Sequence, residues 1–162
     1  MVLRIDDWVF DVDVTATMAH SAREAREHCD CGYCRNFYSA LDRKYPDLRP
    51  FLTQFGIDAE APDVMSPVPM SEDTVLYEPE YIVIGKLLKK GEYEIDCGNA
   101  HILAEEPEKG TYPYDRLPKG TKCFMLYVMD LMLPWVLSEA MDSVISPAND
   151  PSLISKLLDK MT

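Results

Sequence analysis

Three cysteines within six residues are the side chains of this sequence best suited to chemistry. Cys29, Cys31 and Cys34 follow a C-x-C-x2-C spacing, and His28 comes directly before them. Thiolates and imidazoles are preferred ligands of zinc, and a closed structural zinc site needs four of them. We therefore predict a candidate zinc site at Cys29, Cys31, Cys34 and His28. No second CxxC pair supplies the fourth ligand by its spacing, so three other side chains remain alternatives to His28: Cys97, His101 and Cys123.

The same cysteines allow two other interpretations. Cys31 and Cys34 form a CxxC pair at the predicted start of a helix, where the helix dipole and free N–H groups lower the pKa of a thiol. In thioredoxin-like folds that redox motif follows a strand of a βαβ unit, whereas here it follows a predicted helix. Cys29 and Cys34 also extend two apolar stripes, which would make them packing residues and leave Cys31 accessible in the turn. Zinc binding, redox chemistry and core packing all remain open.

A second pattern, Asp11-x-Asp13-x-Thr15, matches the DxDxT motif of haloacid-dehalogenase-like phosphatases. In that motif the first Asp attacks phosphate and the second acts as a general acid or base. Those enzymes need a parallel sheet and a later acidic pair that holds magnesium, and the rest of this sequence predicts neither. Asp13 is also well placed to cap the following helix. The phosphatase is therefore a remote alternative.

Residues His20, Glu24 and His28 line one strip of a predicted helix, at positions i, i+4 and i+8. Such a strip could hold a metal ion at the surface. Because Met18 and Ala22 lie on the opposite, apolar side, we interpret the strip as the solvent-exposed face of the helix.

Helical periodicity dominates the first third of the chain and positions the cysteines. Two short strands, 2–5 and 8–12, precede helices predicted over 13–29, 34–45 and 47–55, so that the cysteines lie at the junction of the first two helices. The inward face of the first helix is predicted from three- and four-residue steps: Val14, Met18, Ala22, Ala25 and Cys29.

Strand signals dominate the second half. An acidic segment with three prolines, 58–74, is predicted to be an exposed, mobile loop. Alternating or continuous apolar runs then predict four strands, at 81–88, 92–97, 100–104 and 122–133. Turn residues at 90–91 and 98–99 predict hairpins between the first three of these strands.

Helices followed by hairpins are typical of the α+β class. We predict N-terminal helices packed on a mainly antiparallel sheet built from hairpins, with a C-terminal helix beginning at Asp150. A chain of 162 residues suits a single α+β domain, 1–162.

The charge of the chain limits its partners. The formal net charge is −12, and no Lys or Arg occurs between Arg49 and Lys86. This surface would repel a phosphate backbone, so nucleic-acid binding is not predicted, whereas a basic or apolar protein partner is compatible with it.

No signal peptide or apolar run long enough for a membrane span is visible, and the odd number of cysteines argues against a secreted disulfide scaffold. A cytoplasmic protein is predicted.

The segments Phe10-Asp11-Val12-Asp13 and Cys29-x-Cys31-x2-Cys34-Arg35-Asn36-Phe37 resemble those of a group of small uncharacterised bacterial proteins. The resemblance covers about the first sixty residues and implies a bacterial cytoplasmic protein; it implies no activity. Because no catalytic motif stands out, the leading hypothesis is a non-catalytic protein-binding or regulatory domain, of the kind found in immunity proteins. The alternative is a zinc-binding or thiol-redox protein centred on the cysteines.

Overall fold

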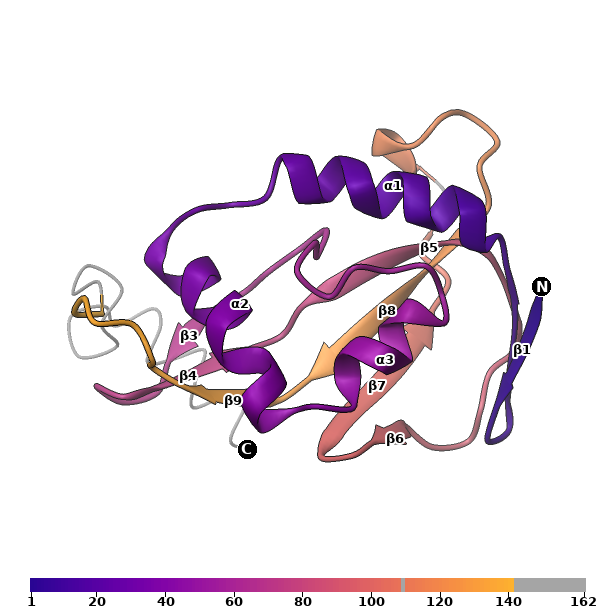
Figure 1. Ribbon diagram of the computed structural model, residues 1–162. Helices are drawn as coiled ribbons and strands as arrows, with labels where there is room; N and C mark the ends of the chain where they lie inside the picture. The colour runs from indigo at the N-terminus through magenta and orange to yellow at the C-terminus, as the bar shows by residue number, and fades with distance from the viewer. Residues whose placement is uncertain (109, 142–162) are drawn as a thin grey trace.

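Two antiparallel sheets with helices along one side make up the part of the chain that the structure, a computed structural model, describes: residues 1–108 and 110–141 (Figure 1). The helices are α1 (Val14–Arg26), α2 (Gly32–Lys44) and α3 (Leu48–Thr53), with a short 3-10 turn, η1 (Tyr114–Arg116). The larger sheet contains, in spatial order, β1 (Val2–Ile5), β2 (Trp8–Val12), β5 (Glu80–Lys89), β8 (Cys123–Met129), β7 (Ala100–Glu105) and β6 (Ile95–Cys97). The smaller sheet contains β3 (Val68–Pro69), β4 (Thr74–Tyr77) and β9 (Leu131–Pro134).

The predicted α+β class is confirmed for these residues, since every strand pair in both sheets is antiparallel. The predicted C-terminal helix lies outside the described residues, and the single domain over 1–162 stays a prediction. None of the described helices is long and apolar enough to cross a membrane.

Aromatic rings join the helices to the larger sheet. The ring of Phe10 stacks on that of Phe124 at 5.3 Å and meets the edge of Phe55 at 5.3 Å, linking β2, β8 and the end of α3. On α2 the buried face includes Phe37 and Leu41, as its helical period predicts. Since burial of such side chains is the main favourable contribution to folding, these contacts fix α2 and α3 against the sheets.

The predicted strand at 122–133 is in fact two strands in different sheets. Asp130 has a φ of 57°, a left-handed conformation that turns the chain sharply between β8 and β9. The chain therefore passes from the larger sheet to the smaller one, and the smaller sheet lies beside the start of α2 (Figure 1).

One of the two predicted hairpins is wrong. Residues 98–99 do join β6 to β7, with Cys97 opposite Ala100. The turn at 90–91 does not pair β5 with β6, because β2 already occupies that edge of β5. The chain instead crosses the β1–β2 turn, where the Trp8 indole N–H donates to the carbonyl of Tyr93 at 2.8 Å. Tyr93 alternates with Glu92 and Glu94, a pattern that predicts one buried and one exposed face, yet its side chain is 76% exposed.

The buried face of α1 also differs from the prediction. It consists of Thr17, His20 and Ser21, whereas Met18 is 57% exposed. The cause is hydrogen bonding rather than apolar packing, because the Ile84 N–H of β5 donates to the Thr17 hydroxyl at 3.0 Å and the Asp58 N–H donates to the Ser21 hydroxyl at 2.8 Å.

The acidic segment 58–74 is only in part the exposed loop that its composition predicts, since residues 70–73 are exposed but the start of the segment packs against the protein. Ala59 and Ala61 are fully or almost fully buried, and the Tyr81 hydroxyl donates to the carbonyl of Ala59 at 2.6 Å. Asp63 then pairs with the start of β5, since its N–H donates to the carbonyl of Glu80 at 2.8 Å. The segment is thus built into the fold between α1 and β5.

Candidate functional site

The sulfur atoms of Cys29, Cys31 and Cys34, called the thiol cluster below, lie within 4.8 Å of one another. Cys34 is buried and Cys31 is exposed, as predicted. Cys29 is exposed and not buried, because α1 ends at Arg26 and residue 29 lies in the following loop. Core packing therefore accounts for Cys34 alone, and two of the three cysteines are exposed to solvent.

Side chains of α2 hold the loop that carries Cys29. The Tyr38 hydroxyl donates to the carbonyl of Cys29, and the Arg35 guanidinium donates to the carbonyl of Asp30, each at 3.0 Å. Residues three apart on a helix share a face, so Arg35 and Tyr38 both reach this loop. The N–H of Cys31 lies 3.4 Å from the sulfur of Cys29, which closes the loop over the first turn of α2.

Asn36 fixes the position of this first turn in the protein. Its side chain is fully buried, donates to the carbonyl of Pro134 at 3.1 Å and accepts from the N–H of Val136 at 2.8 Å. The Tyr77 hydroxyl of β4 donates to the carbonyl of Tyr33 at 2.6 Å. The cysteines are thus carried by a helix start that is tied to the smaller sheet.

The three thiols differ in acidity. Partial burial alone would raise the pKa of Cys31, but the backbone N–H of Cys34 and the thiols of Cys29 and Cys34 outweigh burial and hold that pKa below its usual range. Cys31 is the N-cap residue of α2, where free N–H groups favour a negative charge. Burial, followed by the nearby Cys31, raises the pKa of Cys34. Cys31 is therefore the thiol of this pair that ionises first.

This difference predicts a selective reaction of Cys31 with iodoacetamide in metal-free protein. The thiolate is the form that reacts with iodoacetamide. Because the pKa of Cys31 is lowered, its alkylation rate should rise at a lower pH than that of an ordinary thiol. We expect Cys31 to be alkylated at neutral pH while Cys34 is not, as read by mass spectrometry of peptides. Unfolding in urea should return Cys31 to an ordinary pH profile; the same profile in folded and unfolded protein would contradict the assignment.

The predicted fourth ligand, His28, does not belong to this group of donor atoms. Its Nδ1 lies 3.3 Å from the carbonyl oxygen of Cys29, and its ring packs edge-on against Tyr38 at 4.9 Å. The three alternatives lie on strands of the larger sheet: Cys97 on β6, His101 on β7 and Cys123 on β8. Among the described residues the thiol cluster thus brings together three protein ligands.

Trp135 and Arg35 border the cluster. The Trp135 ring lies edge-on to Tyr33 at 5.7 Å and packs over Gly32, where an added Cβ would be 3.5 Å from the indole. Its indole N–H donates to the carbonyl of Glu139 at 2.7 Å, and the Glu139 carboxylate pairs with Arg35. Trp135 is therefore a natural fluorescent reporter next to Cys31.

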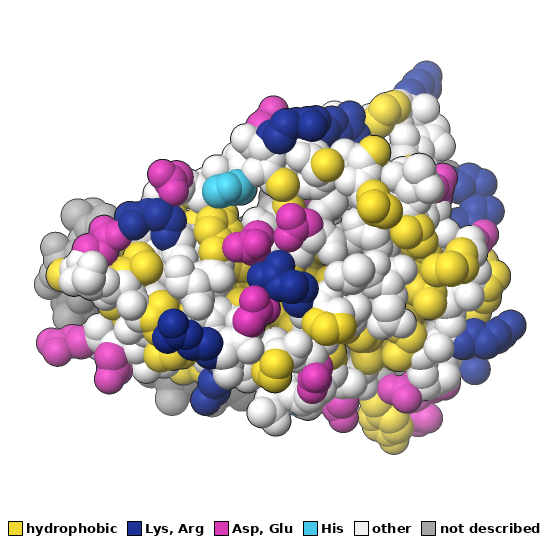
Figure 2. Space-filling model, in the orientation of Figure 1, with side chains coloured by type: hydrophobic (Ala, Val, Ile, Leu, Met, Phe, Trp, Pro, Cys, Tyr) yellow, Lys and Arg dark blue, Asp and Glu magenta, His cyan; other side chains and the backbone are white. Residues whose placement is uncertain are grey.

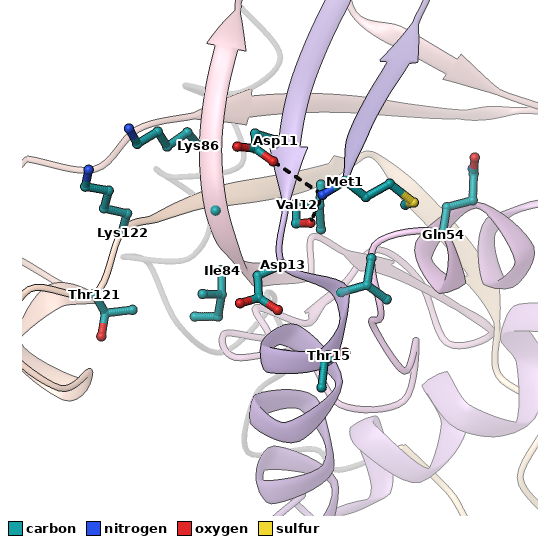
Figure 3. A pocket seen from close by; sticks show the side chains of 12 residues that line it. Met1, Asp11, Val12, Asp13, Thr15, Gln54, Ile84, Lys86, Thr121 and Lys122 are labelled. Carbon is teal, nitrogen blue, oxygen red and sulfur yellow. Dashed lines mark hydrogen bonds and ion pairs between the residues drawn. The ribbon is translucent and has the colours of Figure 1, made fainter.

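The DxDxT residues line a separate groove of about 820 Å³ between β2, β5 and the start of α1 (Figure 3). Asp13 caps α1 as predicted, since it accepts from the N–H of Ala16 at 3.0 Å. Asp11 is exposed and pairs with the N-terminal amine at 3.4 Å, while Lys86 and Lys122 extend away from Asp13 (Figure 3). The antiparallel pairing of β2 with both its neighbours is not the parallel sheet that the phosphatase motif requires.

A second group of potential ligands was missed in the sequence. His20, predicted to face solvent, is buried, and its Nε2 lies 2.5 Å from Asp63 and 4.0 Å from Glu24. The i, i+4 spacing of His20 and Glu24 was visible, but their burial and the partner from the acidic segment were not.

Comparisons of this chain with protein-family models, with curated proteins and with solved structures found no match. The resemblance to small bacterial proteins stays a prediction, and the site is interpreted from its own geometry.

Proposed function

We propose that this protein binds a thiophilic metal ion, zinc in particular, through Cys29, Cys31 and Cys34. The observation that supports this proposal is the convergence of the three sulfurs within 4.8 Å. Tetrahedral bonds of about 2.3 Å place sulfur ligands about 3.8 Å apart, so a small contraction of the cluster suffices. The lowered pKa of Cys31 favours the thiolate that a metal needs.

Three protein ligands leave one position of a tetrahedral zinc ion for water or for another ligand. Sites of this kind are the open ones that exchange ligands, whereas structural zinc sites are closed by a fourth protein ligand. Either His28, after a change of its side-chain rotamer, or an exogenous donor would fill the position. The exposure of Cys29 and Cys31 gives both the ion and that donor a path from solvent.

Thiol-redox chemistry is the second candidate, and the unequal acidity of Cys31 and Cys34 favours it. An ionised Cys31 is the attacking thiol of a CxxC pair, and Cys34, whose pKa is raised by burial, would be the second thiol. Forming a disulfide between them would release two protons and two electrons to an oxidant such as a disulfide of another molecule.

The hypothesis of a protein-binding or regulatory domain stays a prediction. Acidic and basic side chains are interspersed on the face shown in Figure 2, and Arg49 pairs with Asp42 at 3.0 Å and with Glu60 at 3.5 Å. The acidic middle segment is thus partly neutralised in the folded protein, so its charge alone does not favour a basic partner strongly.

Elemental analysis of the purified protein tests the metal proposal. We expect about one zinc ion per chain, bound through the cysteines. Cys31→Ser should lower the affinity for zinc at least about 100-fold, since even the loss of a residue that only hydrogen-bonds to a metal ligand lowers metal affinity 10–100-fold. Cys123→Ser is the matched control, because Cys123 is a buried thiol on β8 away from the cluster.

Further readouts separate the alternatives. Binding of Co²⁺ should give thiolate charge-transfer absorption and change the fluorescence of Trp135, and Cys31 should resist labelling until a chelator is added. His28→Ala should leave the zinc content unchanged if the fourth position is held from outside. Absence of thiolate–metal absorption, with Cys31 labelled rapidly without a chelator, would contradict metal binding.

A further inference from the structure

A second group of metal-ligand side chains lies under the helical side of the molecule, between α1 and β5. His20 and Glu24 come from α1 and Asp63 from the segment between α3 and β3, and their donor atoms lie within 4.8 Å of one another. The side chain of His20 is 9% exposed and that of Asp63 is 4% exposed. This group, called the imidazole–carboxylate group below, shares no residue with the thiol cluster.

Asp63 is held rigidly by the sheet. Its N–H donates to the carbonyl of Glu80 at 2.8 Å, and its Oδ2 accepts from the N–H of Ile82 at 2.7 Å. These bonds aim Oδ1 at the Nε2 of His20, 2.5 Å away. One carboxylate oxygen is thus used by the fold, and the other is directed into the group.

The group carries more negative charge than its imidazole can balance. Two carboxylates face one histidine, and among the described residues neither Glu24 nor Asp63 forms an ion pair with a Lys or Arg. Glu80, beside Asp63, is partly buried as well. Burying uncompensated charge costs free energy, and a bound cation is one way to offset it.

The hydroxyl of Tyr112 is an independent sign of a missing partner. It is buried, and it has no hydrogen-bond partner. Burial, followed by the negative charge of Asp63, raises the pKa of Tyr112 to about 12 against the lowering effect of Arg116, and Glu24 and Glu80 make smaller contributions to the rise. The Tyr112 side chain packs against the cluster of Ile82, Cys123 and Met125, and the N–H of Ile82 is the donor to Asp63. Buried hydroxyls without a partner are rare in proteins.

We propose that His20, Glu24 and Asp63 bind a divalent first-row transition-metal ion. One imidazole nitrogen and two carboxylate oxygens suit manganese and iron as well as zinc, whereas thiolates favour zinc over manganese. Bonds of about 2.1 Å place neighbouring donors about 3.4 Å apart around a tetrahedral ion and about 3.0 Å apart around an octahedral one. The contact between His20 and Asp63 would widen, and Glu24 would approach.

Titration of the full chain with Mn²⁺, followed by loss of the free-ion EPR signal and by the unfolding temperature, tests this proposal. We expect one Mn²⁺ per chain and a rise of the unfolding temperature on binding. Cys31→Ser should bind Mn²⁺ as the wild type does, which separates this site from the thiol cluster. Glu24→Gln should weaken Mn²⁺ binding about 10-fold or more, as expected for loss of a charged ligand.

Glu27→Gln is the matched control, because Glu27 is an exposed glutamate at the end of the same helix. It removes the same charge and should leave Mn²⁺ binding unchanged. An equal loss of Mn²⁺ affinity in the two variants would mean that binding depends only on the net charge of the protein, and it would overturn the proposal.

A plain ion pair between His20 and the carboxylates gives a different result. In EDTA, Glu24→Gln should then be less stable than Glu27→Gln. The wild type should not bind Mn²⁺, and Cys31→Ser should not bind Zn²⁺. That outcome would also overturn the proposal. A metal site predicts that Glu24→Gln is at least as stable as the wild type in EDTA, because repulsion from Asp63 is removed.

Discussion

Asn36→Ala is expected to lower the free energy of unfolding by about 3 kcal/mol, since each buried backbone group left without a partner costs about 1–3 kcal/mol. The change would leave two partly buried backbone groups without this partner, the carbonyl of Pro134 and the N–H of Val136. It would also remove a donor to the Tyr77 hydroxyl at 3.3 Å and leave a cavity. Urea denaturation monitored by circular dichroism measures the loss.

Asn99→Ala is the control for this variant. Asn99 lies exposed in the turn between β6 and β7, so the same substitution should change the free energy of unfolding by no more than about 0.5 kcal/mol. Asn36→Ala should also weaken zinc binding at the thiol cluster, because Asn36 ties the first turn of α2 to the segment after β9. Wild-type stability of Asn36→Ala would show that this network contributes little.

Gly85→Ala is expected to destabilise the protein by about 2–5 kcal/mol, from left-handed strain of about 1–2 kcal/mol together with overpacking of about 1–3 kcal/mol. Gly85 has a φ of 145°, and a Cβ there would lie 2.1 Å from the carbonyl oxygen of Asp11. That atom belongs to the backbone of β2, so the two strands would have to move apart.

Gly120→Ala separates the two contributions. Gly120 also has a positive φ, 87°, but an added Cβ meets no atom within 4 Å. It should therefore show the conformational strain alone, about 1–2 kcal/mol. Thermal unfolding of both variants gives the difference; equal losses would mean that the close approach of β2 and β5 at Gly85 is easily relaxed.

Local patterns predicted the elements whose partners are near in the chain. The helical period of residues 34–45 and the capping role of Asp13 both hold in the structure, as does the 98–99 hairpin. The spacing of the three cysteines made a thiol site a candidate, but six residues of extended chain can span about 17 Å. The local fold between α1 and α2, and not the chain length, brings the three sulfurs within 4.8 Å of one another. What the spacing could not predict is that Cys29 is exposed, since this depends on where α1 ends.

The features that the patterns failed to predict depend on partners far away in the chain. The turn at 90–91 is a sound local signal, yet β2 takes the edge of β5 that the hairpin would use. The alternation of Tyr93 with Glu92 and Glu94 likewise fails to predict burial, because this segment crosses the β1–β2 turn and its Tyr93 carbonyl accepts from the Trp8 indole.

By itself the sequence determined the class of fold, the helix that carries Cys34 and the chemical identity of the thiol cluster. Only the tertiary structure decided which face of α1 is buried and what His20 contacts, because Asp63 lies 43 residues further along the chain. A helical period shows which residues share a face. Whether that face meets water, an apolar core or a carboxylate is set by the strand that packs against it, and here the hydroxyl of Thr17 and the N–H of Ile84 join α1 to β5.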